Sequence, residues 1–147
     1  MQQLNFNIHI PTKKEKVWKA IWSEKNYRTW CSIFEEGSHY KIDEWKLGST
    51  IQFLSSSKNG IYSKIIRYAR EQLIEFEHLG TVLAGEPQAI NDESKAWSGA
   101  RERYNLTEEG SCCILAIKID VMSEHVDFMR SKFPLALERI KQISLGQ

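Results

Sequence analysis

The feature that most constrains the fold is an amphipathic segment near the end of the chain, at residues 125–144. Its apolar side chains recur at steps of three and four residues, which places them on one face of an α-helix. They are Val126, Met129, Phe133, Ala136, Leu137 and Ile140. A helix of about 20 residues is about 30 Å long. We therefore expect a long final helix that needs a broad apolar surface to cover its stripe.

That surface is expected to be a β-sheet, because most of the preceding chain has strand patterns separated by turn signals. We expect strands at residues 3–10, 38–45, 49–54, 61–69, 72–79, 98–107 and 112–121. A short helix is expected at 13–22, a second short helix or turn at 26–34, and a long loop or mobile flap at 80–95. Strands joined by short turns pair antiparallel, and the absence of βαβ alternation excludes a doubly wound parallel sheet. Seven strands spaced by about 4.8 Å span about 29 Å, so the final helix can cross the whole sheet if the sheet curls around it.

Local signals refine the expected boundaries. Thr12 and Glu15 have the spacing of a capping box for the first helix, and Ser123 is a suitable cap for the last one. Asn59-Gly60 predicts a tight hairpin turn, because both residues tolerate positive φ. Pro134 lies inside the final helix, where the apolar stripe stays in phase on both sides. We therefore expect a bend near Arg130 and no break.

Length and composition favour a soluble protein with one domain over residues 1–147. The net charge of +1 argues against nucleic-acid binding, which normally needs a basic excess. The first ten residues lack the pattern of a signal peptide, and no apolar run is long enough to span a bilayer. Neither the three cysteines nor the four histidines have metal-ligand spacing. We expect a cytoplasmic protein, monomeric or weakly dimeric, without a metal or another cofactor.

The order of these elements resembles the helix-grip fold of the START-like superfamily, also called SRPBCC and including Bet v 1-like proteins. Within it the chain is similar to the activator of heat-shock-protein-90 ATPase homologue-like group. The resemblance rests on "IHIPTKKEKVWKAIWSEKNYRTW", "FEEGSHYKIDEWKLGSTIQF", "IEFEHLG" and "FPLALERIK". It implies an α+β fold with a curved antiparallel sheet of about seven strands, two short helices after the first strand, and a long C-terminal helix across the sheet. It also implies a cavity between the sheet and that helix.

Two polar residues interrupt apolar rows on the expected inner face of the sheet. His78 follows Ile74 and Phe76 on one strand face, and Glu102 shares a face with Tyr104 on the next long strand. Antiparallel pairing would bring His78 and Glu102 together, and a buried carboxylate needs a partner. The pair could orient a polar ligand group or act as acid and base. It could also be purely structural, or strand twist could expose one member.

The candidate pocket residues combine this pair with aromatic and apolar side chains near the implied cavity. They are Trp30, Phe34, Phe53, Phe76, His78, Trp97, Glu102, Tyr104, Met129 and Phe133. The leading hypothesis is binding of a small hydrophobic or amphipathic molecule, such as a lipid, without catalysis. A protein-interaction module acting on a chaperone is the alternative, and a cyclase-type enzyme using His78 and Glu102 is a third. The same large side chains could instead fill the cavity completely.

Overall fold

The protein combines one antiparallel sheet with a long closing helix. The computed structural model describes residues 1–146. The strands are β1 (Gln2–Ile10), β2 (His39–Ile42), β3 (Thr50–Leu54), β4 (Gly60–Ala69), β5 (Leu73–Leu83), β6 (Glu86–Pro87), β7 (Arg101–Glu109) and β8 (Cys112–Val121). The helices are α1 (Lys14–Trp22), α2 (Glu24–Cys31), α3 (Asp92–Lys95), the short 3-10 helix η1 (Ser123–His125) and α4 (Val126–Ser144).

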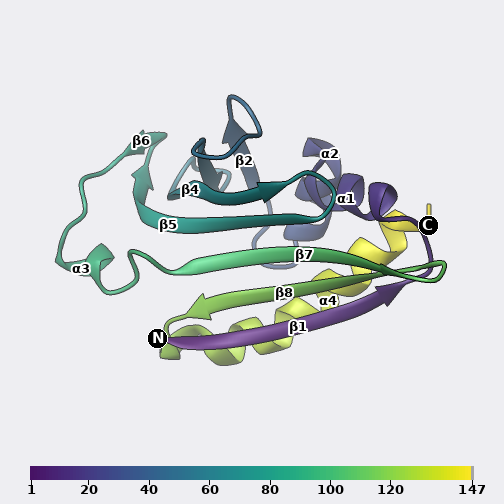
Figure 1. Ribbon diagram of the computed structural model, residues 1–147. Coiled ribbons are helices and arrows are strands. Elements are labelled where there is room, and N and C mark those ends of the chain that lie inside the picture. The colour runs from purple at the N-terminus through teal and green to yellow at the C-terminus, as the bar shows by residue number, and fades with distance from the viewer. Residues whose placement is uncertain (147) are drawn as a thin grey trace.

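The strands follow the order β1-β8-β7-β5-β4-β3-β2, and the two-residue β6 pairs with β5 outside this path. Every pairing is antiparallel. In Figure 1, α4 runs beside β1 and β8, and its C-terminal end lies near α1 and α2 at one end of the sheet. The predicted α+β helix-grip architecture, with a curved antiparallel sheet closed by the last helix, is confirmed.

The core lies between the inner face of the sheet and the apolar stripe of α4. Strand β8 shows the sheet side of this core, because every second residue along it is buried. On the helix side, Phe133 stacks on Phe6 of β1 with ring centroids 4.9 Å apart. All of the predicted stripe is buried except Met129, which is half-buried. Pro134 is exposed and α4 continues through it as one helix, because the lost hydrogen bond lies on the solvent side.

Two predicted helix caps are wrong. Helix α1 begins after Lys13, not Thr12, and no side chain bonds its first turn. Helix α4 begins after His125, because Ser123 starts the short 3-10 helix that precedes it. In both cases the residue with the capping side chain lies outside the N-cap position. Only from that position could its side-chain oxygen accept a hydrogen bond from the free N–H groups of the first turn. Among residues 1–146, no helix is both long and apolar enough to cross a lipid bilayer.

The predicted turn and the predicted loop also need correction. In the β3–β4 connection the positive φ of 63° belongs to Lys58, and Gly60 already begins β4. The segment 80–95 contains the end of β5, the short strand β6 and the helix α3, so it is a loop only in part. Gly80 lies within β5, where a Cβ would come within 2.6 to 2.7 Å of the Tyr62 side chain. Its glycine therefore reflects a close contact and not a turn.

Candidate functional site

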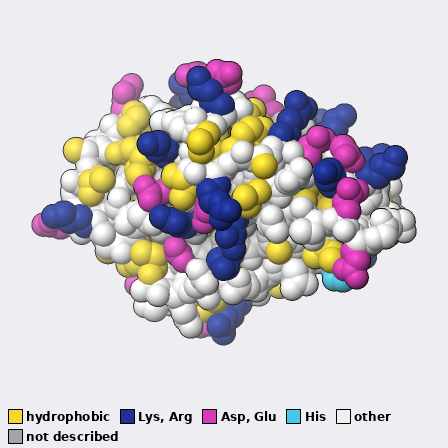
Figure 2. Space-filling model, viewed as in Figure 1, with side chains coloured by type: hydrophobic (Ala, Val, Ile, Leu, Met, Phe, Trp, Pro, Cys, Tyr) yellow, Lys and Arg dark blue, Asp and Glu magenta, His cyan; other side chains and the backbone are white. Residues whose placement is uncertain are grey.

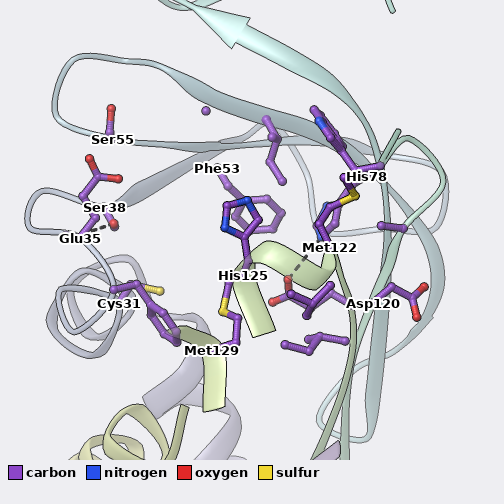
Figure 3. A pocket seen from close by; sticks show the side chains of 18 of the residues that line it. Cys31, Glu35, Ser38, Phe53, Ser55, His78, Asp120, Met122, His125 and Met129 are labelled. Atoms are coloured by element: carbon purple, nitrogen blue, oxygen red, sulfur yellow. Dashed lines mark hydrogen bonds and ion pairs between the residues drawn. The ribbon is translucent and has the colours of Figure 1, made fainter. Parts of the chain in front are cut away.

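A pocket with a volume of about 790 Å³ opens between the sheet, α2, α3 and the start of α4. Nearly all of the candidate residues line it, and the exception is Phe76. The lining members are Trp30, Phe34, Phe53, His78, Trp97, Glu102, Tyr104, Met129 and Phe133. The alternative of a completely filled interior is therefore not what the structure shows. Figure 3 shows Met129 and His125 of the helical side opposite Phe53 and His78 of the sheet.

Phe76 lies in the packed core behind the pocket wall. It is fully buried, and its ring contacts Trp22 at 5.5 Å and Phe53 at 5.2 Å between centroids. Trp30 is also almost completely buried, and its indole N–H donates to the backbone oxygen of Ile21 at 2.9 Å. Trp30 is thus a fixed wall of the pocket, because its only donor is already used inside the protein.

A chain of polar side chains crosses the inner face of β4, β5 and β7. The Ser63 hydroxyl lies 2.6 Å from Nδ1 of His78, and Nε2 of His78 lies 3.3 Å from Oε1 of Glu102. Tyr104 donates a short hydrogen bond to Oε2 of the same carboxylate. Strand register creates this order, because Ser63 pairs with His78 and Glu102 pairs with Phe76, two residues from His78. The predicted contact between His78 and Glu102 is confirmed.

The network assigns the proton on one side of His78. A carboxylate only accepts, so Nε2 of His78 donates to Glu102. Nδ1 accepts the proton of the Ser63 hydroxyl when the imidazole is neutral and donates to the hydroxyl oxygen when it is protonated. Ser63 is completely buried and lies outside the pocket lining. Its hydroxyl therefore holds the orientation of His78 and is not placed to attack a molecule in the pocket.

Electrostatics keep the Glu102 side chain charged and the side chains of Tyr104 and Cys31 neutral. Burial alone would raise the pKa of Glu102, but the hydrogen bond and charge of His78 and the bond from Tyr104 together lower it below 4.5. Burial, followed by the charge of Glu102, raises the pKa of Tyr104 well above 10.0. Burial likewise raises the pKa of the Cys31 thiol. The inner wall of the pocket therefore carries a carboxylate, a phenol and a thiol at neutral pH.

The segment that was predicted to be a loop builds one side of the pocket. Asn91 caps α3 through a hydrogen bond from the Ser94 backbone N–H at 2.9 Å, and the Ser94 hydroxyl accepts from the Asn91 N–H at 2.9 Å. Further along, the Ser98 hydroxyl donates to the backbone oxygen of Leu79 at 2.8 Å. These bonds fix the position of Trp97 on the pocket wall.

Sequence reasoning missed many residues of the site, among them Tyr27 and Cys31 in the lining and Ser63 behind it. Tyr27 and Cys31 of α2 line the pocket. They are one helical turn apart, and a pattern that short does not indicate which side of the helix faces a cavity. Ser63 did carry a signal, since it stands between Ile61 and Ile65 on one strand face. A polar residue in an apolar row is the same pattern that identified His78 and Glu102.

Comparisons with known proteins place this arrangement among solved folds. No protein-family model and no curated protein matches the sequence. The Aha1 dimer from Colwellia psychrerythraea is 18% identical, with a TM-score of 0.66 over 97% of this chain and 95% of that one. The AHSA1-like protein from Aeromonas hydrophila is 12% identical, with a TM-score of 0.67 over 99% and 93%.

A third neighbour is DynU16, described as a putative protein in the dynemicin biosynthetic locus. It is 8% identical, with a TM-score of 0.66 over 97% of this chain and 46% of that one. At these identities the likeness shows the fold alone. The sheet order and the closing helix α4 agree with it. The chain therefore has the same fold as these solved proteins, and the helix-grip fold expected from the sequence is confirmed.

Proposed function

We propose that the chain binds a small amphipathic molecule in the pocket between the curved sheet and α4. The single observation that carries this proposal is the composition of the pocket wall. Aromatic and apolar side chains make most of it, and His78, Glu102 and Tyr104 place a few polar atoms at one position. Small-molecule sites commonly have this composition and volumes of about 300 to 1,000 Å³, a range that includes the 790 Å³ found here.

The fold supports the proposal without naming the ligand. DynU16, by its description, belongs to a biosynthetic locus, so one neighbour with this fold is associated with small-molecule chemistry. We infer binding without catalysis for this chain, because the hydroxyl beside His78 is buried behind the wall. A molecule in the pocket would meet the Glu102 carboxylate already held by two hydrogen bonds, and the Cys31 thiol, whose pKa is raised by burial.

The test is a titration of the protein with a mixed panel of fatty acids, sterols, flavonoids and long-chain amines, followed by ¹⁵N–¹H NMR. We expect at least one class to produce saturable shifts in residues 76–79, 101–106 and 126–137, which surround the pocket. Shifts spread over the outer surface, or no shifts with any class, would contradict the proposal. The first result would then direct attention to partners on the outer face.

A pair of variants on α4 separates pocket filling from general damage. Met129 lines the pocket, whereas Leu135 is 53% exposed. Met129→Trp adds volume inside the pocket, so we expect ligand affinity to fall by about 10-fold or more. Leu135→Trp makes a comparable change on the solvent side and should leave affinity unchanged. Equal effects of the two variants would show that the ligand does not occupy this pocket.

A further inference from the structure

The Asp, Glu, Lys and Arg side chains that line the pocket all carry one sign of charge. The lining residues include six carboxylates and no lysine or arginine, although the whole chain has 20 Lys and Arg against 19 Asp and Glu. The acidic members are Glu35, Asp92, Glu93, Glu102, Asp120 and Glu124. Met1, His78 and His125 are the other lining residues that can carry charge through an amine or imidazole. In contrast, the face of the molecule in Figure 2 shows basic and acidic side chains intermixed.

The six carboxylates divide into an exposed rim and one inner group. Glu35, Asp92 and Glu124 are exposed at the rim, and Figure 3 shows Glu35 and Asp120 on opposite sides of the opening. Exposed carboxylates of this kind attract cations to the opening of the pocket. Salt screens their interaction with an individual bound ligand. The side chain of Glu102 is only 25% exposed. Its interaction with a ligand is screened much less.

Glu102 can accept further hydrogen bonds without losing those it has. A carboxylate has about four lone-pair positions, and His78 and Tyr104 each occupy one. The remaining positions and the partial exposure leave room for a donor that enters the pocket.

Three donors near Glu102 are, in contrast, already used. Nε2–H of His78 and the Tyr104 hydroxyl both point at Glu102, and the Trp30 indole N–H bonds Ile21. An anionic ligand at this position would face a weakly screened carboxylate with these three donors turned away from it. A carboxylate head group is therefore disfavoured, and a positively charged donor is favoured.

We propose that the pocket selects an amphipathic organic cation, with an ammonium group at Glu102 and an apolar body against Trp30, Phe53 and Met129. This inference rests on the proposed function and specifies its ligand class. Fatty acids, which share the apolar body, become the disfavoured class. Neutral alcohols of equal length are intermediate, because they can donate to Glu102 but bring no charge.

Three probes with the same chain test the head group alone: decan-1-amine, decan-1-ol and decanoate, each below its micelle concentration. Affinity is measured by calorimetry and by the NMR shifts around the pocket. The alcohol can also donate to the carboxylate, so the difference between the two probes comes from the positive charge of the amine. The amine should therefore bind about 10-fold more tightly than the alcohol, and decanoate should bind weakest.

Two matched variants assign the preference to one side chain. Glu102→Gln keeps the shape of the inner wall and removes its charge, so the amine should lose about 10-fold in affinity while the alcohol changes little. Glu77→Gln removes the same charge from the opposite face of the sheet on β5, where Glu77 faces Arg101 at 4.0 Å. It should leave all three affinities unchanged. Denaturation curves check that both variants are folded.

The outcomes separate the two proposals. Equal affinity for the amine and decanoate on the unchanged protein would overturn the cation inference and leave the pocket as a ligand site. Failure of all three probes to bind would overturn both. A preference for the amine that persists in Glu102→Gln would show that Glu102 does not receive the head group. Loss of the preference in Glu102→Gln alone supports the inference, and the comparison on the unchanged protein holds even if that variant fails to fold.

Discussion

The contact between His78 and Glu102 makes a quantitative prediction about the coupling of the two side chains. The distance from Nε2 to Oε1 is 3.3 Å, and the side chains are 11% and 25% exposed. A hydrogen bond to a charged group is worth about 1.5 to 3 kcal/mol. This one is longer than the 2.7 to 2.9 Å typical of charge-assisted bonds, so we expect the lower part of that range. The predicted coupling free energy is about 1.5 to 2 kcal/mol.

A double-mutant cycle measures this coupling. The unchanged protein, His78→Ala, Glu102→Ala and the double variant are unfolded in urea at pH 7, with tryptophan fluorescence as the signal. His78→Ala also leaves the buried Ser63 hydroxyl without its partner, which costs about 1 to 3 kcal/mol by itself. The cycle removes that contribution, because it is present in both arms that lack His78.

The exposed pair Glu77 and Arg101 provides the control cycle. Its atoms are 4.0 Å apart, and the Arg101 side chain is 56% exposed, so its coupling should not exceed about 0.5 kcal/mol. If the changes for His78 and Glu102 add within about 0.5 kcal/mol, or match the control, the two groups do not interact as the structure indicates. Our account of the inner polar chain would then be refuted.

Two further predictions concern stability. Because burial and the charge of Glu102 raise the pKa of Tyr104 above 10.0, its contribution is complete below about pH 10 and is lost as pH rises towards its folded pKa. The free energy of unfolding of Tyr104→Phe, measured by chemical denaturation, should therefore fall less steeply with pH between about pH 10 and 12 than that of the unchanged protein. An equal dependence on pH in the two proteins would contradict this. Gly80→Ala places a Cβ within 2.7 Å of the Tyr62 ring and should lower the free energy of unfolding by about 1 to 3 kcal/mol. A double variant with Tyr62→Ala should recover part of that loss, and no recovery would refute the proposed clash.

The sequence predicts those parts of the fold that depend on long, regular patterns. Strands β1 and β8 alternate over nine and ten residues, and α4 keeps its stripe over 19 residues. Such lengths let the hydrophobic period outweigh local exceptions, including Pro134. The same alternation places His78 and Glu102 on the inner face, and antiparallel pairing then brings them together.

What the sequence does not predict depends on contacts between distant residues. A glycine such as Gly80 is typical of a turn, yet this one lies within β5. It pairs with Tyr62 on β4, whose side chain occupies the space that a Cβ would need. The capping box that does form, at Asn91 and Ser94, stabilises a helix of only four residues, too short to give a period. The volume of the pocket depends on how far Phe53 and Met129 extend into it, and strand alternation carries no information about that distance.

Glu102 shows why stability and binding must be measured separately in this protein. A carboxylate next to apolar walls is unfavourable, and His78 and Tyr104 offset that cost with two hydrogen bonds. A purely structural role would be complete when both oxygens have a partner. Glu102 nevertheless lines a pocket from which every lysine and arginine is absent within the described residues. Glu102→Gln retains the shape and removes the charge, so a folded variant with altered head-group preference would show that the carboxylate serves the ligand as well as the fold.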